Sequence, residues 1–274
     1  MRAGDWEERP VWCRARRLSL RGVRTAVLAV LAACGSDRTR ADSAFIRSDT
    51  AAPTQSRATQ LRDAPVASSD SGPAAGARST ILFAGTSITA GLGLEPDSAY
   101  PNLIQRKIDS AGLPFQVVNG GVSGETSSGL LERLNWLLRG TFDVFVLETG
   151  ANDGLRGIPA STLRSNLETA LDRVRAKRPD ASIVLVQMEA LPNLGAKYAS
   201  AFHAVYPAVA REKGVTLLPF LLDGVAGHRG LNQGDGVHPN YAGERIVAAN
   251  VWRGLEPILA ARAGTKWAAR RGDR

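Results

Sequence analysis

A serine, a histidine and an aspartate of this sequence have types and neighbours that suit nucleophilic chemistry. Ser87 follows an apolar run in a Gly-Thr-Ser segment, and His238 comes three residues after Asp235 and directly before a proline. A serine hydroxyl becomes a good nucleophile only when a base takes its proton, and the base needs an acceptor that orients it. A short, rigid loop can hold the Asp235 carboxylate against the His238 imidazole. The three residues are therefore a candidate triad of nucleophile, base and orienting group.

Each of these residue types also has a common structural explanation. A serine at a strand-to-helix turn more often caps the helix than it attacks a substrate. The chain has two other histidines, His203 in a predicted helix and His228 in a glycine-rich loop, and such histidines are usually surface or core residues. Asn152 lies in a Gly-Ala-Asn-Asp-Gly segment, which is typical of a turn. Each signal is weak when it is taken alone.

The elements that must position these residues belong to an α/β sheet. From residue 79 onward, short apolar runs alternate with segments that carry apolar residues at spacings of three and four, as strands and amphipathic helices do. The predicted strands span residues 81–85, 116–119, 144–148, 183–188 and 216–218. The predicted helices centre on residues 100–108, 130–138, 163–174, 196–213 and 240–261. Together they predict a three-layer α/β/α sandwich around a five-stranded parallel sheet.

The polar segments fall at one edge of this predicted sheet. Ser87 follows the first strand, Gly124 the second and Asn152 the third. Asp235 and His238 precede the last helix. Active sites of such sheets lie outside the carboxyl ends of the strands, so these residues are expected to meet there.

In order and spacing, the segments resemble the four blocks of the SGNH or GDSL hydrolase family, especially its branch of thioesterase I, lysophospholipase and arylesterase enzymes. The resemblance extends from residue 81 to about residue 259, and its most specific strings are Gly-Ala-Asn-Asp-Gly-Leu-Arg-Gly at 150–157 and Asp-Gly-Val-His-Pro-Asn at 235–240. It implies a flavodoxin-like SGNH hydrolase fold. The sequence has no metal cluster with ligand spacing, and we expect no cofactor and no metal.

The resemblance also implies a role for each site residue. Ser87 would be the nucleophile, His238 the base and Asp235 its orienting group. The oxyanion hole would consist of the backbone N–H groups of Ser87 and Gly124 and the side chain of Asn152. The implied reaction is hydrolysis of carboxylic ester or thioester bonds, in a small-molecule or lipid substrate, through an acyl-enzyme.

Thr86 departs from the family pattern. The first block of the family reads Gly-Asp-Ser, whereas this chain has Gly85-Thr86-Ser87. The family Asp is outside the triad and helps to hold the nucleophile loop, and a Thr hydroxyl can still donate or accept one hydrogen bond. We therefore expect an active enzyme of reduced rate, in which Thr86→Asp keeps or raises kcat.

Two other functions stay open at this point. The same fold supports carbohydrate O-acetylesterases, because one fold can carry several chemistries. A catalytically inactive, surface-binding lipoprotein is the second alternative, and the departure at Thr86 is its only support.

The first 34 residues are typical of an export signal. A basic stretch at 14–24 precedes an apolar run at 25–33, which is far shorter than the roughly 20 residues of a membrane span. The run ends in Leu-Ala-Ala followed by Cys34, which resembles the lipobox of bacterial lipoproteins. Lipidation of Cys34 would anchor the protein at the periplasmic face or the outer membrane. An ordinary secretory signal, giving a soluble secreted protein, is the alternative.

The remaining ranges complete the predicted organisation. Residues 35–78 are poor in large apolar groups and are expected to be a disordered tether, residues 79–262 the hydrolase domain, and residues 263–274 a loose basic tail. Cys13 and Cys34 are the only cysteines, so the domain has no disulfide and no cysteine metal site.

The net charge of +8 comes from the ends of the chain. The first 34 residues hold seven arginines and three acidic residues, and residues 262–274 hold five basic residues and one acidic residue. Residues 35–261 hold 22 of each sign. A neutral body does not offer the basic surface that nucleic acids need, so we expect no nucleic-acid partner.

Overall fold

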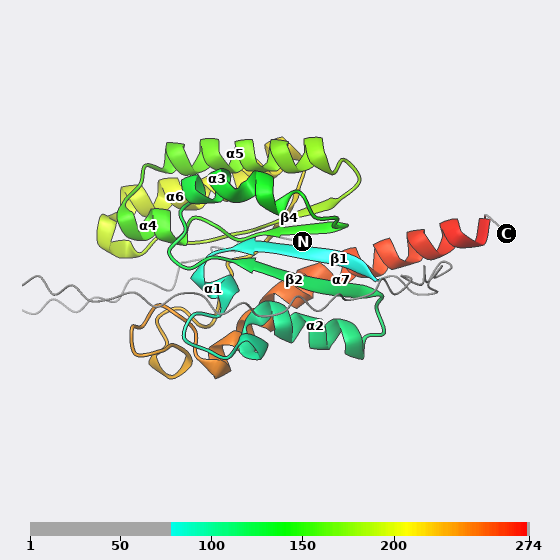
Figure 1. The fold of residues 1–274 in the computed structure, drawn as a ribbon. Helices are drawn as coiled ribbons and strands as arrows, with labels where there is room; N and C mark the ends of the chain where they lie inside the picture. The colour runs from blue at the N-terminus through cyan, green and yellow to red at the C-terminus, as the bar shows by residue number, and fades with distance from the viewer. Residues whose placement is uncertain (1–77, 273–274) are drawn as a thin grey trace, which may run out of the picture. The chain divides into compact units, whose positions relative to one another are not determined.

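The computed structural model of the chain describes residues 78–272 (Figure 1). The predicted export signal, Cys34 and nearly all of the predicted tether lie outside the described residues. Within the described part, a parallel sheet has the strand order β2-β1-β3-β4-β5. Its strands are β1 (Ser79–Gly85), β2 (Phe115–Gly121), β3 (Val144–Leu147), β4 (Ser182–Val186) and β5 (Thr216–Leu218).

Helices cover both faces of this sheet. The helices are α1 (Ser87–Ala90), α2 (Tyr100–Ser110), α3 (Ser127–Leu137), α4 (Ala151–Arg156), α5 (Ala160–Lys177), α6 (Ala196–Lys213) and α7 (Tyr241–Gly272). Three short 3-10 turns span Pro96–Ser98, Pro192–Leu194 and Arg229–Leu231. Helices α3, α5 and α6 lie on one face, and α2 and α7 lie on the other (Figure 1). The predicted three-layer sandwich with a five-stranded parallel sheet is confirmed.

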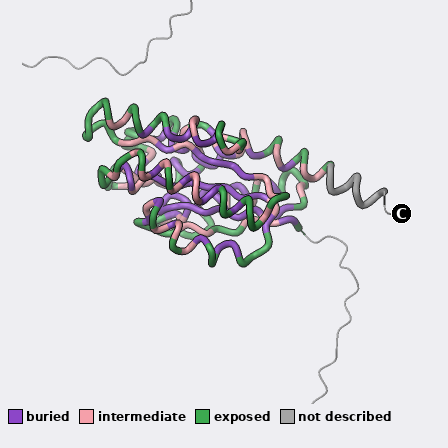
Figure 2. The backbone as a smooth tube through the Cα atoms, turned by 90° about the horizontal axis from the view of Figure 1, so that it is seen from above, coloured by how far each residue is buried: buried purple, intermediate pink, exposed green. Residues whose placement is uncertain are grey.

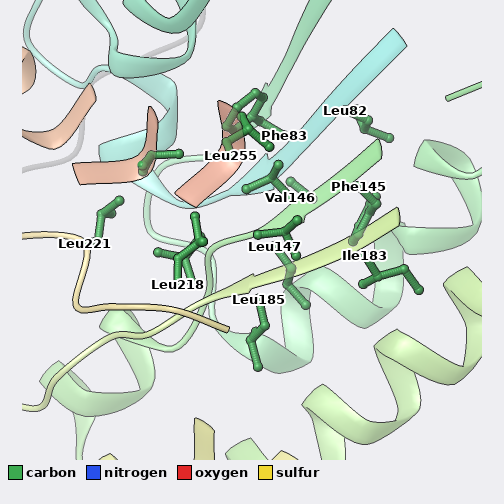
Figure 3. Close-up of a cluster of buried hydrophobic side chains, with 14 of the residues drawn as sticks. Leu82, Phe83, Phe145, Val146, Leu147, Ile183, Leu185, Leu218, Leu221 and Leu255 are labelled. Atoms are coloured by element: carbon green, nitrogen blue, oxygen red, sulfur yellow. The ribbon is translucent and has the colours of Figure 1, made fainter. Parts of the chain in front are cut away.

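The inner strands form the core because they are buried on both faces. All four residues of β3, Val-Phe-Val-Leu, are buried, as are the last four of β4. Strands covered by helices on both sides read as continuous apolar runs, which is why the sequence marks them clearly. Figure 3 shows Val146, Leu147 and Leu185 pointing from neighbouring strands into the surrounding layers. Each fully buried side chain of this size contributes about 1.5–3 kcal/mol to folding.

The helices pack through one apolar face each. In α5, Leu163, Leu167, Leu171 and Val174 recur at spacings of three and four, and all are buried. The solvent-facing sides of the helices are exposed while the strands inside are buried (Figure 2). None of the helices in residues 78–272 has both the length and the hydropathy that crossing a bilayer requires.

The end of α7 corrects one prediction. The last helix was expected to end at residue 261 and to be followed by a loose tail from residue 263, but α7 continues to Gly272. Leu255 and Leu259 anchor the helix on the core. Once a helix is nucleated, each added residue needs little more than favourable propensity, and residues 263–272 are rich in Ala, Arg and Lys. The prediction relied on the apolar pattern alone, which stops earlier than the helix.

The strand order places three loops side by side. β1 lies between β2 and β3, with Gly85 paired with Gly121 and Ala84 paired with Leu147. Ser87 follows β1 at the start of α1, Gly124 lies in the loop after β2, and Asn152 follows β3 at the start of α4. The three segments therefore leave the sheet next to one another at its carboxyl edge.

Candidate active site

The structure brings Ser87, His238 and Asp235 into one hydrogen-bonded line. The Ser87 Oγ lies 2.8 Å from the His238 Nε2, and the His238 Nδ1 lies 2.6 Å from the Asp235 Oδ2. An ionised Asp235 can only accept, so the ring proton is on Nδ1 and the Ser87 hydroxyl donates to Nε2. This is the arrangement in which a histidine can take the serine proton.

The turn that carries Ser87 is not held by a serine cap. Thr86 is the N-cap of α1 with extended backbone, and Ser87 is the first helical residue. The Ser87 hydroxyl bonds His238 rather than a backbone N–H of its own helix. Ser87 is 7% exposed, so it is a buried residue at the carboxyl edge of the sheet and does not lie on an open surface. The capping explanation for this serine is therefore excluded.

The loop of Asp235 is wound tightly around its carboxylate. Oδ1 accepts from the backbone N–H groups of Val237 at 2.9 Å and His238 at 3.0 Å, while Oδ2 accepts from the imidazole. Gly236 has a φ of +71°, a left-handed value that glycine adopts without strain. The N–H and imidazole of His238, together with the N–H of Val237, lower the pKa of Asp235 to about 2. Asp235 therefore stays ionised beside the imidazole under ordinary conditions.

Gln233 ties the histidine loop to the serine loop, and the sequence analysis did not single it out. Its side-chain amide donates to the carbonyl of Leu92 at 2.7 Å and to that of Pro239 at 2.9 Å. Its backbone N–H donates to the carbonyl of His238 at 2.7 Å. A side chain at Gly93 would lie 2.4 Å from the Gln233 Oε1, so glycine there leaves room for the tie. In the sequence, Gln233 is marked only as a polar residue two positions before Asp235, which does not indicate a contact with the serine loop.

The Gly124 loop and Asn152 also meet at this edge. Gly124 has a φ of +77°, and the Asn152 Nδ2 donates to the carbonyl of Glu125 at 3.0 Å. One turn later on α4, the Arg156 Nη2 donates to the carbonyl of Gly124 at 3.0 Å. Residues four apart on a helix share one face. α4 thus holds two successive carbonyls of this loop, and Asn152 keeps a second amide hydrogen for another acceptor.

Arg133 fixes the other side of the same loop. It is ion-paired with the Glu125 carboxylate and donates to the carbonyl of Gly120 at 2.8 Å. Both side chains are largely buried. A charge-assisted bond in a sheltered position resists solvent competition, so the loop that carries Gly124 is held at both ends.

Thr86 is fully buried, and its partner is a residue that the sequence analysis took only as the end of a strand. The Thr86 hydroxyl donates to the Glu148 Oε1 at 2.9 Å, and its backbone N–H donates to Oε2 at 2.7 Å. Burial raises the pKa of Glu148, and the hydrogen bonds from Thr86 and Thr89 oppose that rise. Thr86 therefore holds this buried group beneath the turn that carries Ser87, and the effect of Thr86→Asp stays a prediction.

The other two histidines lie apart from this line of groups. His203, on α6, pairs with the Glu189 carboxylate at 2.7 Å in an exposed position. His228 precedes the 3-10 turn at Arg229–Leu231. Among the described residues, no three His, Cys, Asp or Glu side chains gather in a way that could hold a metal ion.

Comparisons with known proteins identify the family. A family model described as GDSL-like lipase/acylhydrolase matches residues 83–246. Esterase TesA from Pseudomonas aeruginosa is 40% identical over 184 residues, which are 67% of this chain and 90% of that protein. The thioesterase 1/protease 1/lysophospholipase L1 of Escherichia coli K12 is 36% identical over 186 residues, 68% of this chain and 87% of that protein. The crystal structure of the psychrotrophic esterase EstA from Pseudoalteromonas sp., inhibited by monoethylphosphonate, has a TM-score of 0.63 at 30% identity and covers 66% of this chain and 98% of that one.

These matches confirm the resemblance drawn from the motifs. The matched residues 83–246 include every residue of the hydrogen-bonded line and of the Gly124 loop. The match covers 90% of esterase TesA in sequence and 98% of the EstA chain in structure. The chain belongs to the GDSL-like lipase/acylhydrolase family.

Proposed function

We propose that this protein is a serine esterase in which Ser87 attacks the carbonyl carbon of a carboxylic ester or thioester. The observation that carries the proposal is the continuous line from Ser87 through His238 to Asp235, at 2.8 and 2.6 Å. The relatives named for esterase, arylesterase, thioesterase and lysophospholipase activity support ester and thioester bonds as the substrate class.

The first half of the reaction forms an acyl-enzyme. As the Ser87 Oγ bonds to the carbonyl carbon, its proton passes to the His238 Nε2, and the Asp235 carboxylate stabilises the imidazolium. The carbonyl oxygen becomes an oxyanion, which the N–H groups of Ser87 and Gly124 and the free amide hydrogen of Asn152 would bind. The tetrahedral centre collapses, and the alcohol or thiol leaves with the proton from His238. The acyl group stays on Ser87.

The second half repeats these steps with water. His238 takes a proton from water, the resulting hydroxide bonds to the acyl carbon, and a second oxyanion forms in the same place. Its collapse breaks the bond to Ser87, which regains its proton from His238. The acid is released, and the enzyme returns to its starting protonation state.

Hydrolysis of a p-nitrophenyl ester series from acetate to palmitate by the full chain tests this proposal, with Ser87→Ala and Ser110→Ala as a matched pair. Ser110 is an exposed serine at the end of α2, and its hydroxyl bonds only a backbone carbonyl of its own helix. We expect turnover by wild type and Ser110→Ala and none by Ser87→Ala. Equal rates in all three proteins would exclude Ser87 as the nucleophile. Acetylated polysaccharide as the only substrate cleaved would favour the carbohydrate O-acetylesterase alternative.

We further propose that the protein is exported and anchored to a membrane by a lipid on Cys34. The support is the apolar run at 25–33, the lipobox-like junction before Cys34 and the polar composition of residues 35–78. The hydrolase domain would then act at the end of a tether, in the periplasm or at the outer membrane.

A further inference from the structure

The serine and the histidine of the proposed site lie in two segments that are far apart in the chain. The serine segment, residues 86–94, follows β1, and the histidine segment, residues 231–240, leads into α7. The histidine segment closes on itself through a backbone bridge between Asn232 and Pro239. Contacts between the two segments must therefore set the distance between the nucleophile and the base.

Two hydrogen bonds join these segments within residues 78–272. One is the 2.8 Å contact between the Ser87 Oγ and the His238 Nε2. The other runs from the side-chain amide of Gln233 to the carbonyl of Leu92, at 2.7 Å. The second bond involves an amide and a carbonyl, which neither gain nor lose a proton during the reaction.

Gln233 is linked to both reacting residues through the backbone. Its own N–H donates to the carbonyl of His238 at 2.7 Å, and its side-chain amide also donates to the carbonyl of Pro239 at 2.9 Å. On the other side, Leu92 donates its N–H to the carbonyl of Ser87 at 3.0 Å. Gln233 and Leu92 therefore form a brace between the two segments, beside the direct contact of the side chains.

The direct contact between Ser87 and His238 is lost during half of the proposed reaction. In the acyl-enzyme, the Ser87 Oγ is bonded to the acyl carbon and has no proton to donate, while His238 must direct its Nε2 at the attacking water. The brace of Gln233 and Leu92 uses neither reacting atom, so it can persist in this state. Position matters there, because a displacement of about 1 Å can lower a rate about a hundredfold.

We propose that Gln233 is a positioning residue that holds His238 in place in the acyl-enzyme, where the side chains of Ser87 and His238 no longer bond each other. The inference rests on the proposed acyl-enzyme reaction. It assigns Gln233 mainly to deacylation, because the direct bond still joins the two segments in the free enzyme. Loss of the brace should therefore slow the attack of water more than the attack of Ser87.

Gln233→Met tests the proposal in the full chain, because methionine has a similar length but donates no hydrogen bond. In p-nitrophenyl esters the leaving group departs readily, so deacylation is expected to limit kcat. With the ester that wild type cleaves fastest, kcat should fall about tenfold, whereas kcat/KM, which reports acylation, should fall less than about threefold. KM should fall as a result. A kcat within about twofold of wild type would overturn the proposal.

Single turnovers with enzyme in excess separate the two steps directly. Release of p-nitrophenolate gives the acylation rate, and mass spectrometry of the intact protein after rapid acid quenching follows the decay of the acyl-enzyme. The decay should be about tenfold slower in Gln233→Met, and the release less than about threefold slower. An equal slowing of both steps would overturn the assignment to deacylation.

Gln233→Glu keeps the test decisive where methionine disturbs the loop. Glutamate has the shape of glutamine, but its ionised carboxylate only accepts hydrogen bonds and would face the carbonyls of Leu92 and Pro239. We expect kcat to fall at least as far as in Gln233→Met. A Gln233→Glu protein with the kcat of wild type would overturn the proposal.

Asn250→Leu is the matched control. Like Gln233, Asn250 donates its side-chain amide to two backbone carbonyls, those of Leu221 at 3.2 Å and Asp223 at 2.8 Å. These bonds join α7 to the loop after β5 and not the two segments of the site. We expect lower thermal stability in Asn250→Leu, with a kcat within about twofold of wild type.

An equal loss of kcat in Asn250→Leu and Gln233→Met would assign the effect to general loosening of the fold and overturn the positioning role. Failure of the wild type on every ester would instead count against the proposed function.

Discussion

Asp235 is placed to orient the proposed base, His238, without competing for its ring proton. Three donors from its own loop lower its pKa to about 2, so it remains an anion wherever the histidine changes charge. An anion at 2.6 Å from Nδ1 fixes the ring proton on that side and leaves Nε2 free to accept from Ser87. The hydrogen bonds that hold the Asp235 carboxylate therefore favour the form of His238 that carries its ring proton on Nδ1.

The pH profile of kcat/KM follows from this arrangement. The proposed base can take the Ser87 proton only when its Nε2 carries none, so the rate should rise with pH as the base is deprotonated. Asp235, whose pKa is lowered to about 2, is already ionised and adds no second step. A rate that does not rise with pH would contradict a histidine base.

Substitutions of His238 and of Asp235 should leave different residual values of kcat. His238→Ala removes the proton acceptor and is expected to lower kcat by about 10⁴-fold or more. Asp235→Asn should leave a higher residual rate, because the orienting group does not transfer the proton. His203→Ala is a suitable control, since His203 also pairs with a carboxylate at 2.7 Å but lies outside the proposed site. Wild-type kcat in His238→Ala, or a comparable loss in His203→Ala, would remove His238 as the base.

The residues of the hydrogen-bonded line were easier to predict from the sequence than those that hold the surrounding loops. Ser87, Asp235 and His238 are weak signals when taken alone, but they lie in segments whose order and spacing match the blocks of the family. Glu148 and Gln233 gave no such signal, because a glutamate at the end of a strand and a glutamine in a loop are ordinary. Their roles depend on which loops the fold brings within about 3 Å, and a linear pattern does not contain that information.

Among the elements, the packing of α7 against α2 buries a second carboxyl group. Glu244, near the start of α7, accepts from the N–H of Tyr100 at the start of α2. Burial is the main cause that raises the pKa of Glu244 to about 8, and the neighbouring Glu148 adds to it. The folded protein therefore keeps a proton on this group at pH values where the unfolded chain has lost it.

The free energy of unfolding should consequently fall as the pH rises. A carboxyl group whose pKa is raised by folding contributes its stabilisation fully below the unfolded value of 4.5 and loses it as the pH passes about 8. The loss should be on the order of a few kcal/mol. Glu244→Gln keeps an acceptor for Tyr100 and has no charge, so it should be more stable than wild type above about pH 8.

Urea unfolding at several pH values checks this prediction, with Glu168→Gln as the control. Glu168 is a partly exposed residue of α5 that pairs with Arg164. The slope of unfolding free energy against pH should flatten in Glu244→Gln and stay as in wild type in Glu168→Gln. A Glu244→Gln protein with the wild-type slope would show that Glu244 is not the linked group.

The strands were the most predictable elements, and the end of α7 was the least. Strands β1, β3 and β4 are buried on both faces, so their apolar runs match the observed bounds within a few residues. The last part of α7 lies beyond the buried Leu259, and no apolar pattern in the sequence marks where the helix stops. Local propensity decides that end, and the apolar pattern used for the prediction does not detect it.

At the scale of the whole molecule, we propose an esterase domain in an exported, lipid-anchored chain. Cys34→Ser should release the protein from the membrane fraction without changing esterase activity, because the lipid attachment site would be lost while the domain is untouched. Cys13→Ser is the matched control, since Cys13 is the other cysteine and lies before the apolar run. Retention of Cys34→Ser in the membrane fraction at both low and high salt would contradict the anchor.

The central claim is that the hydroxyl of Ser87 is the group that attacks the substrate. Treating the full chain with a fluorophosphonate and mapping the adduct by mass spectrometry tests it most directly, because this reagent captures a serine only where a base and an oxyanion site activate it. The account predicts one adduct, on the peptide that contains Ser87, formed in parallel with the loss of esterase activity. An adduct on another serine, or inactivation of the enzyme with Ser87 unmodified, would contradict it.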